Sequence, residues 1–499
     1  MDLQTSIYEN VINPALIDDV IPLCELAKNL EEAGEFDRAA DTLSSFWNGL
    51  LNRPKTDGLQ PPAKAELLLR SGTLTGWLGS AKQVAGAQEA AKDLISESAA
   101  LFESLQMREK VAEARVDLAI CYWREGALDE GRVTLRLVLD EVGRAGSEQT
   151  LRALLNSALI EWAATRDRDA LKICKESATL FDSSSSDALK GKFHNTYAAV
   201  LRSLGSSENR EDYIDRALVE YAAASYHFEQ AGHKRFQARV ENNVGYLFAT
   251  IGRFAEAQEH LAYSRTLSLN IGDHGGAAGA EDSRAQAFIL EGKYDLAEKT
   301  ARSAVHSLRH GGEQAMLAEA LTTHGKALAR LEQTHIAKAA LDQALEISQT
   351  AGNPDRGGIA AVTAIEELSD LPVEALQNYY RTAENLLSNS QNLSIRTRLG
   401  ECARRVLSVA LTEAGSTTDA STDMPPLQPG FSLDSEVLRY EGNLIRRALE
   451  DSGGSVTRAA RLLGVTHQGL AFILNGRHSD LLSIRTPVKR RRRSIIRHH

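Results

Sequence analysis

Small and apolar residues recur along most of the chain with a period close to 40 residues. Two segments define the period, GRFAEAQEHL from Gly252 and GKYDLAEKTA from Gly292, in which a short turn precedes an apolar helical pattern. Related turns begin at six further positions: Gly34, Gly86, Gly126, Thr165, Asp212 and Glu332. A unit repeated at a fixed spacing indicates a solenoid. The pattern therefore predicts an all-α array of about eight helix pairs.

Each turn lies between two positions that carry glycine or alanine. The position seven residues before the turn holds Ala27, Gly79, Ala119, Ala158, Ala198, Gly245, Ala285 and Gly325, where Ala198 is counted from Gly205 because an insertion follows Leu204. The position five residues after the turn holds Ala39, Ala91, Gly131, Ala170, Ala217, Ala257, Ala297 and Ala337. Small side chains at both positions allow the two helices of a hairpin to approach closely.

This pattern resembles the tetratricopeptide repeat, and the resemblance covers roughly residues 15–350. The period exceeds the usual 34 residues, which favours longer helices. A HEAT-like array has a similar period but does not explain the paired small positions. The resemblance implies a concave surface suited to a protein or peptide partner. Helical patterns over 355–412 are expected to cap the array, so we assign residues 1–413 to the solenoid.

The periodicity ends in GSTTDASTDMPPLQPG, which indicates a flexible linker over residues 414–431. Helical spacing resumes at Ser435 and stops at Gly453-Gly454, where glycine readily adopts the left-handed conformation that ends a helix. Two short helices are expected to follow, capped by Ser455 and Thr466 and separated by Gly464. Val465, Leu470 and Leu474 are expected to complete the core. Three helices with a tight turn between the last two form a helix-turn-helix over residues 432–478.

These residues resemble the Fis-type helix-turn-helix of bacterial DNA-binding proteins. The matching positions are Leu444-Ile445, Ala448-Leu449, Gly453, Thr457, Ala459-Ala460, Leu463-Gly464-Val465 and Leu470, with Leu474 closing the core. The resemblance implies that the third helix enters the major groove and that the module works as a dimer. Candidate contacts to DNA are Ser455, Thr457, Thr466, His467, Gln468, Ala471, Asn475 and Arg477. Gln468 and Asn475 have the amide groups that pair with adenine edges, and Thr466 can contact a phosphate.

The expected recognition helix departs from the family because it carries no Lys or Arg. Gly469 also stands where a Thr is common. Two apolar residues, Phe472 and Ile473, lie near its middle. We expect them to pack against Leu481, Leu482 and Ile484, although a dimer or protein contact is an alternative.

The missing charge is present in the tail, which we define as residues 479–499. It contains five consecutive cations, Lys489, Arg490, Arg491, Arg492 and Arg493. Residues 431–499 carry a net charge of +7, whereas the rest of the chain carries −17. We interpret the tail as an arm that contacts phosphates or a minor groove, with a disordered solubilising tail as the alternative. A nuclear localisation signal is a further alternative.

The composition excludes several other functions. The four cysteines are isolated from one another, as expected of reduced core residues in a cytosolic protein. No apolar run approaches the roughly 20 residues that span a bilayer, and the first residues do not form a secretory signal. The sequence contains no P-loop, HExxH or GxSxG motif. His306 and His310 have a metal-binding spacing but lack a third ligand nearby. We expect no enzyme activity, no metal and no cofactor.

The sequence therefore predicts a bacterial transcriptional regulator that is cytoplasmic and associates with the nucleoid when bound to DNA. Its solenoid would sense a protein or peptide, its C-terminal module would bind double-stranded DNA, and a homodimer is possible. The main alternative is a protein-interaction scaffold whose C-terminal helices bind protein instead of DNA. A small inducer in the solenoid is a third reading, for which the sequence offers no pocket signature.

Overall fold

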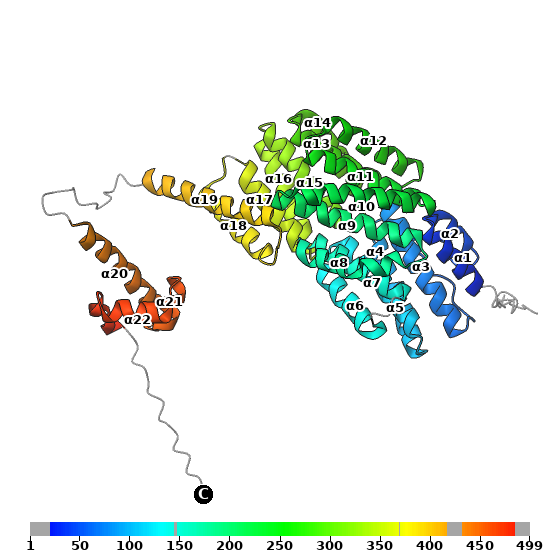
Figure 1. The fold of residues 1–499 in the computed structure, drawn as a ribbon, viewed down its shortest axis with the longest axis horizontal. Helices are drawn as coiled ribbons and strands as arrows, with labels where there is room; N and C mark the ends of the chain where they lie inside the picture. The colour runs from blue at the N-terminus through cyan, green and yellow to red at the C-terminus, as the bar shows by residue number, and fades with distance from the viewer. Residues whose placement is uncertain (1–19, 144–146, 369, 417–431, 485–499) are drawn as a thin grey trace, which may run out of the picture. The chain divides into compact units, whose positions relative to one another are not determined.

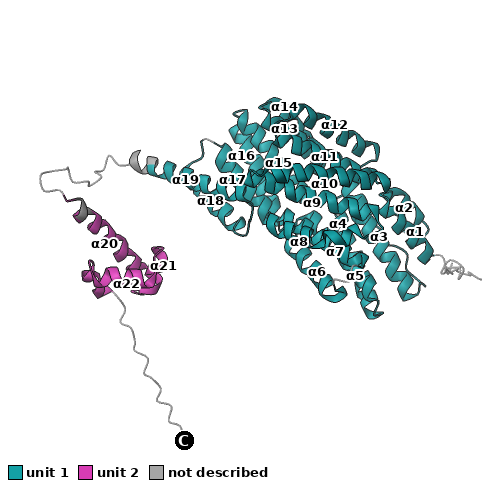
Figure 2. Ribbon diagram, in the orientation of Figure 1, with its two compact units in different colours: residues 1–414 teal, residues 415–499 magenta. Residues whose placement is uncertain are grey.

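The computed structural model describes residues 20–143, 147–368, 370–416 and 432–484. These residues are helical with connecting turns and contain no strand, as predicted (Figure 1). The chain divides into two compact units, Met1–Ala414 and Gly415–His499 (Figure 2). None of the helices within the described ranges is long and apolar enough to cross a membrane.

The first unit contains the eight predicted helix pairs. They are α1 (Val20–Glu32) with α2 (Phe36–Thr42), α3 (Pro61–Lys82) with α4 (Ala87–Ser104), α5 (Arg108–Glu125) with α6 (Leu128–Val142), α7 (Glu148–Ala163) with α8 (Asp167–Asp182), α9 (Asp187–Glu208) with α10 (Glu211–Gln230), α11 (Lys234–Thr250) with α12 (Phe254–Asn270), α13 (His274–Leu290) with α14 (Tyr294–Leu308), and α15 (Gln314–Arg330) with α16 (Thr334–Thr350). The fifth turn lies at Asn209, three residues before the predicted Asp212, because the residues inserted after Leu204 lengthen α9.

Both predicted sets of small residues are buried throughout. Two pairs show why a larger side chain is excluded. A Cβ on Gly245 would lie 2.7 Å from Leu261 Cγ and 3.0 Å from the Ala257 carbonyl oxygen. A Cβ on Gly325 would meet Leu341 Cγ at 2.7 Å in the same way. The small residues therefore set the distance between the two helices of a hairpin.

Early repeats also contact late ones, which the periodicity alone does not predict. Trp77 of α3 stacks on Phe36 and meets the edge of Phe236 of α11, with ring centroids 4.9 Å and 6.2 Å away. Ser80 donates to Glu313, which precedes α15. The helix α3 also contacts α13 directly. The solenoid therefore winds back onto its own first turn.

The C-terminal end of the first unit takes part in this closure. It consists of α17 (Pro354–Glu367), α18 (Val373–Leu386) and α19 (Leu393–Ser416), which cover the last repeat as predicted. Thr165, in the turn between α7 and α8, adopts a φ of 54°, which is unfavourable for a β-branched residue. Its hydroxyl lies 2.9 Å from Asp355 Oδ1 and 2.8 Å from Ser390 Oγ, and its carbonyl accepts from the Gln391 amide. These contacts hold the strained turn.

The four cysteines, Cys24, Cys121, Cys174 and Cys402, are all free and buried, as predicted. Burial raises the pKa of the Cys121 thiol to about 12. These thiols therefore remain protonated and act as small apolar side chains in the core.

The close approach at Gly245 predicts opposite effects for two Gly→Ala changes within helices. Gly245→Ala should lower the stability of the first unit by about 1–3 kcal/mol, because the new methyl group overlaps Leu261 and the Ala257 carbonyl. Gly400→Ala in α19 meets no atom within 4 Å and should leave stability equal or raise it by about 0.5–1 kcal/mol. Thermal unfolding of the two variants measures the difference, and equal melting temperatures would contradict the packing role of Gly245.

Candidate nucleic-acid interface and solenoid cavity

The second unit packs three helices and a 3-10 turn around one core. The elements are α20 (Leu433–Asp451), α21 (Val456–Leu462), α22 (His467–Asn475) and η2 (Ser479–Ile484). Their buried core comprises Ile445, Ala448, Leu449, Val456, Ala459, Ala460, Leu470, Leu474 and Leu481. The small Ala459 and Ala460 allow α21 to approach its neighbours. Val465 was expected in this core, but it is 43% exposed because the turn at Gly464 directs it outward.

The turns follow the predicted glycines. Gly453, Gly454 and Gly464 all have positive φ, and the Gly454 amide donates to the Leu449 carbonyl at 2.7 Å to end α20. Thr466 caps α22 as predicted, since its hydroxyl accepts from the Gly469 amide at 3.0 Å. Ser455 occupies the cap position of α21, but its side chain forms no capping bond. The expected cap at Ser455 is therefore wrong, and α21 begins without that stabilisation.

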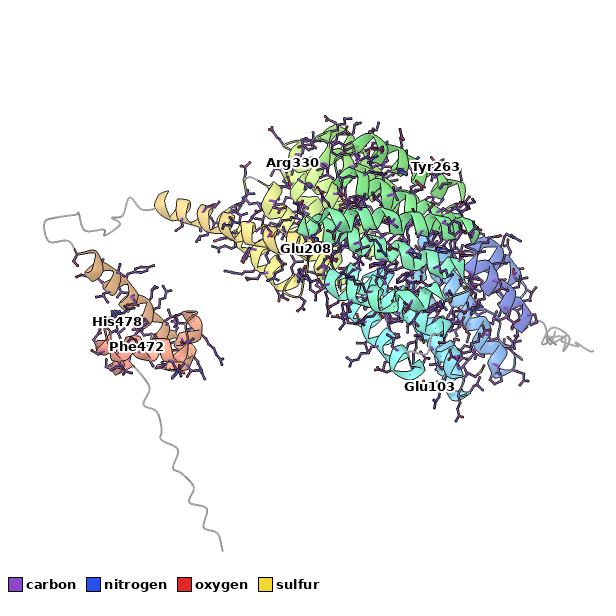
Figure 3. All side chains as sticks on the ribbon, viewed as in Figure 1. Glu103, Glu208, Tyr263, Arg330, Phe472 and His478 are labelled. Carbon is purple, nitrogen blue, oxygen red and sulfur yellow. The ribbon has the colours of Figure 1, made fainter. Side chains whose placement is uncertain are left out.

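The outer face of α22 consists of polar candidates and one aromatic ring. His467, Gln468 and Asn475 are exposed, and Ala471 between them is partly exposed. Phe472 belongs to this face and is 82% exposed, so the expectation that it packs against η2 is wrong (Figure 3). Ile473 does pack on the core with Leu482 and Ile484. The helix α22 has one buried face, formed by Leu470 and Leu474, and the polar candidates with Phe472 lie on the opposite, exposed face.

A second candidate site is a cavity of about 370 Å³ inside the first unit. Its wall comes mainly from the first helices of the repeats, α1, α3, α5, α7, α9, α11 and α15, together with α17. Three tryptophans contribute, Trp77, Trp123 and Trp162. Sequence reasoning missed this site because it forms only when early and late repeats meet.

Amide side chains line part of this cavity. Asn243 donates to Asn195 Oδ1 at 2.9 Å, and Asn156 and Asn242 lie on the same wall. The Asn242 side-chain oxygen is buried and has no hydrogen-bond partner among the described residues. A primary amide can donate and accept at once, which is how it pairs with a peptide group.

A buried ion network supports the wall. Arg70 is 2% exposed, and its guanidinium donates to Glu31 at 3.0 Å and to Glu113 at 2.7 Å. Burial raises the pKa of Glu31 to about 8 despite the opposing effect of Arg70. Burial would also raise the pKa of Glu113, but Arg70 and Lys28 hold it well below its ordinary value. Arg70 therefore keeps α1, α3 and α5 together at one end of the cavity.

Comparison with known proteins agrees with both parts of this architecture. Residues 439–471 match the family model described as bacterial regulatory protein, Fis family. The chain is similar to the crystal structure of a Rap protein complexed with competence and sporulation factor, with 14% identity, a TM-score of 0.53, and coverage of 77% of this chain and 99% of that one. A search among curated proteins finds no match to this sequence.

Two other solved structures show weaker likeness. Yeast Tom70 has 12% identity and a TM-score of 0.39, covering 81% of this chain and 84% of its own. The APC/C hetero-tetramer Cut9–Hcn1 has 15% identity and a TM-score of 0.39, covering 92% and 82%.

This chain joins a tetratricopeptide-like solenoid to a Fis-type helix-turn-helix. Its α22 is the third helix of that motif, and α21 is the second. None of the described arginines of the motif lies on α22, and two of them lie on α21, which packs against α22. Arg458 and Arg461 of α21 are exposed and form no ion pair with any residue in the described ranges. The sequence signal for them was two arginines spaced i, i+3, away from the buried Ala459-Ala460 face.

The remaining candidates differ in their surroundings. Thr457 is exposed at the start of α21, and Ser455 is half-buried. Arg477 pairs with Glu441 of α20 at 2.6 Å, and the buried His478 bonds the other oxygen of the same carboxylate at 2.9 Å. These bonds lower the pKa of Glu441 against the opposing effect of desolvation. Arg477 is thus partly neutralised. Lys489 to Arg493 lie outside the described residues.

Alanine substitutions at the two cap positions, Thr466 and Ser455, should change hydrogen exchange differently. Thr466→Ala removes a capping bond worth about 1 kcal/mol, so the first-turn amides of α22 should exchange hydrogen about fivefold faster. Ser455→Ala removes no cap and should leave α21 unchanged. Hydrogen–deuterium exchange of the full chain gives both rates. Equal acceleration in the two variants would contradict this assignment.

Proposed function

We propose that this chain is a DNA-binding transcriptional regulator of bacterial type, in which the solenoid senses a protein or peptide and the Fis-type module binds duplex DNA. The observation that carries the proposal is the exposed polar face of α22 beside the unpaired Arg458 and Arg461. In a helix-turn-helix the third helix contacts bases while the preceding helix contacts phosphates. Polar side chains can hydrogen-bond to base edges, and arginines can neutralise phosphates.

The solenoid supports the sensing half of the proposal. The similar Rap protein was crystallised with competence and sporulation factor. The cavity here has asparagine amides for pairing with a peptide backbone and tryptophans for apolar contacts. The acidic first unit is unsuited to DNA, which supports the C-terminal module as the part that would bind nucleic acid.

The decisive experiment is a fluorescence-anisotropy titration of the full chain with random duplex at low salt. Saturable binding that weakens as salt rises supports the regulator. No binding in dilute buffer favours the scaffold alternative. The exposed apolar side chains of Leu462, Val465 and Phe472 in this module are the observation that favours the alternative, since exposed apolar residues suit a protein partner.

The salt dependence of binding tests the assigned cations. Arg458→Gln/Arg461→Gln should weaken binding on every sequence and reduce the slope of log K against log salt by up to about 2, since each phosphate contact contributes about 0.9. Arg136→Gln/Arg381→Gln, two exposed solenoid arginines, is the charge-matched control and should leave the slope unchanged. Replacing residues 489–493 by alanine extends the test to the tail, where an unchanged slope would exclude phosphate contact.

Base reading predicts a sequence-dependent loss. Gln468→Ala should weaken binding by about 1–3 kcal/mol on the preferred site and leave binding to random duplex unchanged. The preferred site is first selected from random oligonucleotides with the wild-type chain. An equal loss on both kinds of DNA would assign Gln468 to the phosphate backbone instead.

An apolar stripe on α20 suits a homodimer. Val437, Tyr440 and Leu444 follow one another at i, i+3 and i+7 and are 57%, 68% and 44% exposed. Residues at this spacing share one helix face. Tyr440→Gln/Leu444→Gln should shift the full chain from dimer to monomer in sedimentation, whereas Arg446→Gln on the opposite face should not. A wild-type monomer at micromolar concentration would exclude this dimer.

A further inference from the structure

Three cations in the wall of the solenoid cavity have no carboxylate partner among the described residues. They are Arg124 of α5, Lys192 of α9 and Arg239 of α11. The other cations of the wall are paired: Lys28 with Glu113 and Glu148, Arg70 with Glu31 and Glu113, Arg152 with Asp117, and Arg356 with Glu319. These three unpaired cations therefore differ from the other charged side chains of the wall.

Arg124 is the most deeply placed of the three. It is 5% exposed, its guanidinium lies 4.0 Å from the centroid of the Trp77 ring, and its Nη2 has no hydrogen-bond partner in the described structure. Gly76 makes room for the guanidinium, because a Cβ there would lie 3.1 Å from Arg124 Nη1. Burial lowers the pKa of Arg124. A buried guanidinium with an unused donor is costly unless an anion or water meets it.

The other two cations approach the neighbouring aromatic ring. Lys192 Nζ lies 5.1 Å and Arg239 Cζ 5.3 Å from the centroid of Phe236, whose ring contacts Trp77 edge to face. Lys192 is half-buried and Arg239 is exposed, so the group runs from the interior of the wall toward solvent. Burial, together with Arg152, lowers the pKa of Lys192 to about 8. Three like charges around two rings that touch each other favour a negative ligand between them.

The carboxylates in the same wall form no ion pair with these three cations, and this includes Glu32, whose charge raises the pKa of Lys192 without an ion pair. Glu313 lies in the same wall, but its carboxylate accepts from Ser80 and forms no ion pair with Arg124. Glu31 is held by Arg70. The cavity therefore combines free donors, an aromatic surface and open volume at one place.

We propose that Arg124, Lys192 and Arg239 form an anion-binding subsite for a carboxylate or phosphate group on an organic ligand. The guanidinium donors suit both anions, and Trp77 and Phe236 face the adjoining apolar part of the ligand. The carboxylate can come from the C-terminus of a peptide or from a small organic acid. The subsite rests on the cavity geometry alone, whereas its role as the sensor input rests on the proposed function.

Tryptophan emission of the full chain reports on this subsite, because three of the four tryptophans line the cavity. The probes are citrate, inorganic phosphate, and the tripeptide acetyl-Ala-Ala-Ala with either a free carboxylate or a C-terminal amide. Ionic strength is held constant with sodium chloride. We expect a saturable emission change and a rise in melting temperature with at least one anionic probe, and no response to the amide.

Variants distinguish binding at the subsite from a general effect of positive charge on the protein. Lys192→Met and Arg239→Gln should each weaken probe binding at least about tenfold, since a hydrogen bond to a charged group contributes about 1.5–3 kcal/mol. Arg136→Gln removes an equal charge from the exposed face of α6 and should bind like wild type. Arg124→Met is a third variant, and its fold is checked by thermal unfolding.

The outcomes decide the proposal. Binding of the tripeptide acid identifies a peptide terminus as the source of the anion, and binding of citrate or phosphate alone identifies a small acid. No saturable response to any probe, or equal responses from Arg239→Gln and Arg136→Gln, overturns the subsite. DNA anisotropy on the same proteins distinguishes the two proposals, because Arg239→Gln should retain wild-type DNA affinity. A chain that binds a probe but no DNA keeps the subsite and loses the regulator.

Discussion

The close approach of the two helices within each repeat is the constraint on which the first unit depends. Glycine or alanine on both sides of every turn fixes that distance, as Gly245 and Gly325 show by excluding even one methyl group. Small rotations between successive repeats accumulate into a superhelix. Here the winding is tight enough for α3 to reach α11 and α13. The cavity is the space that remains inside.

The repeats could be predicted from sequence because their signal is local and recurs eight times. Closure could not, because each contact between turns of the superhelix uses a different chemistry. Gly34 makes room for His233, Trp77 meets the edge of Phe236, and Thr165 bonds Asp355 and Ser390. These pairs lie about 160 to 225 positions apart and share no motif. The unpaired state of Arg124 is likewise visible only once its surroundings are known.

The helix-turn-helix shows the same division between local and tertiary information. Leu470 and Leu474 were predicted inward because helical spacing assigns them to one face, and Thr466 was predicted as a cap from its position. The exposure of Phe472 could not be predicted, because the sequence allowed both Phe472 and Ile473 to pack against η2. In the structure only Ile473 occupies that position. Ser455 has the right residue type for a cap, yet its hydroxyl forms no such bond. Capping thus needs geometry as well as composition.

A ligand can shift a protein between states only through a difference in affinity for them. The anion subsite meets this requirement because its parts come from both sides of the closure. Trp77 and Arg124 belong to the second and third repeats, whereas Lys192, Phe236 and Arg239 belong to the fifth and sixth. An anion between them removes their mutual repulsion and so favours the closed winding. The same winding holds the turn at Thr165 against Ser390 and Gln391, directly before α19. The proposed subsite and the start of α19 therefore both depend on the same closure of the solenoid.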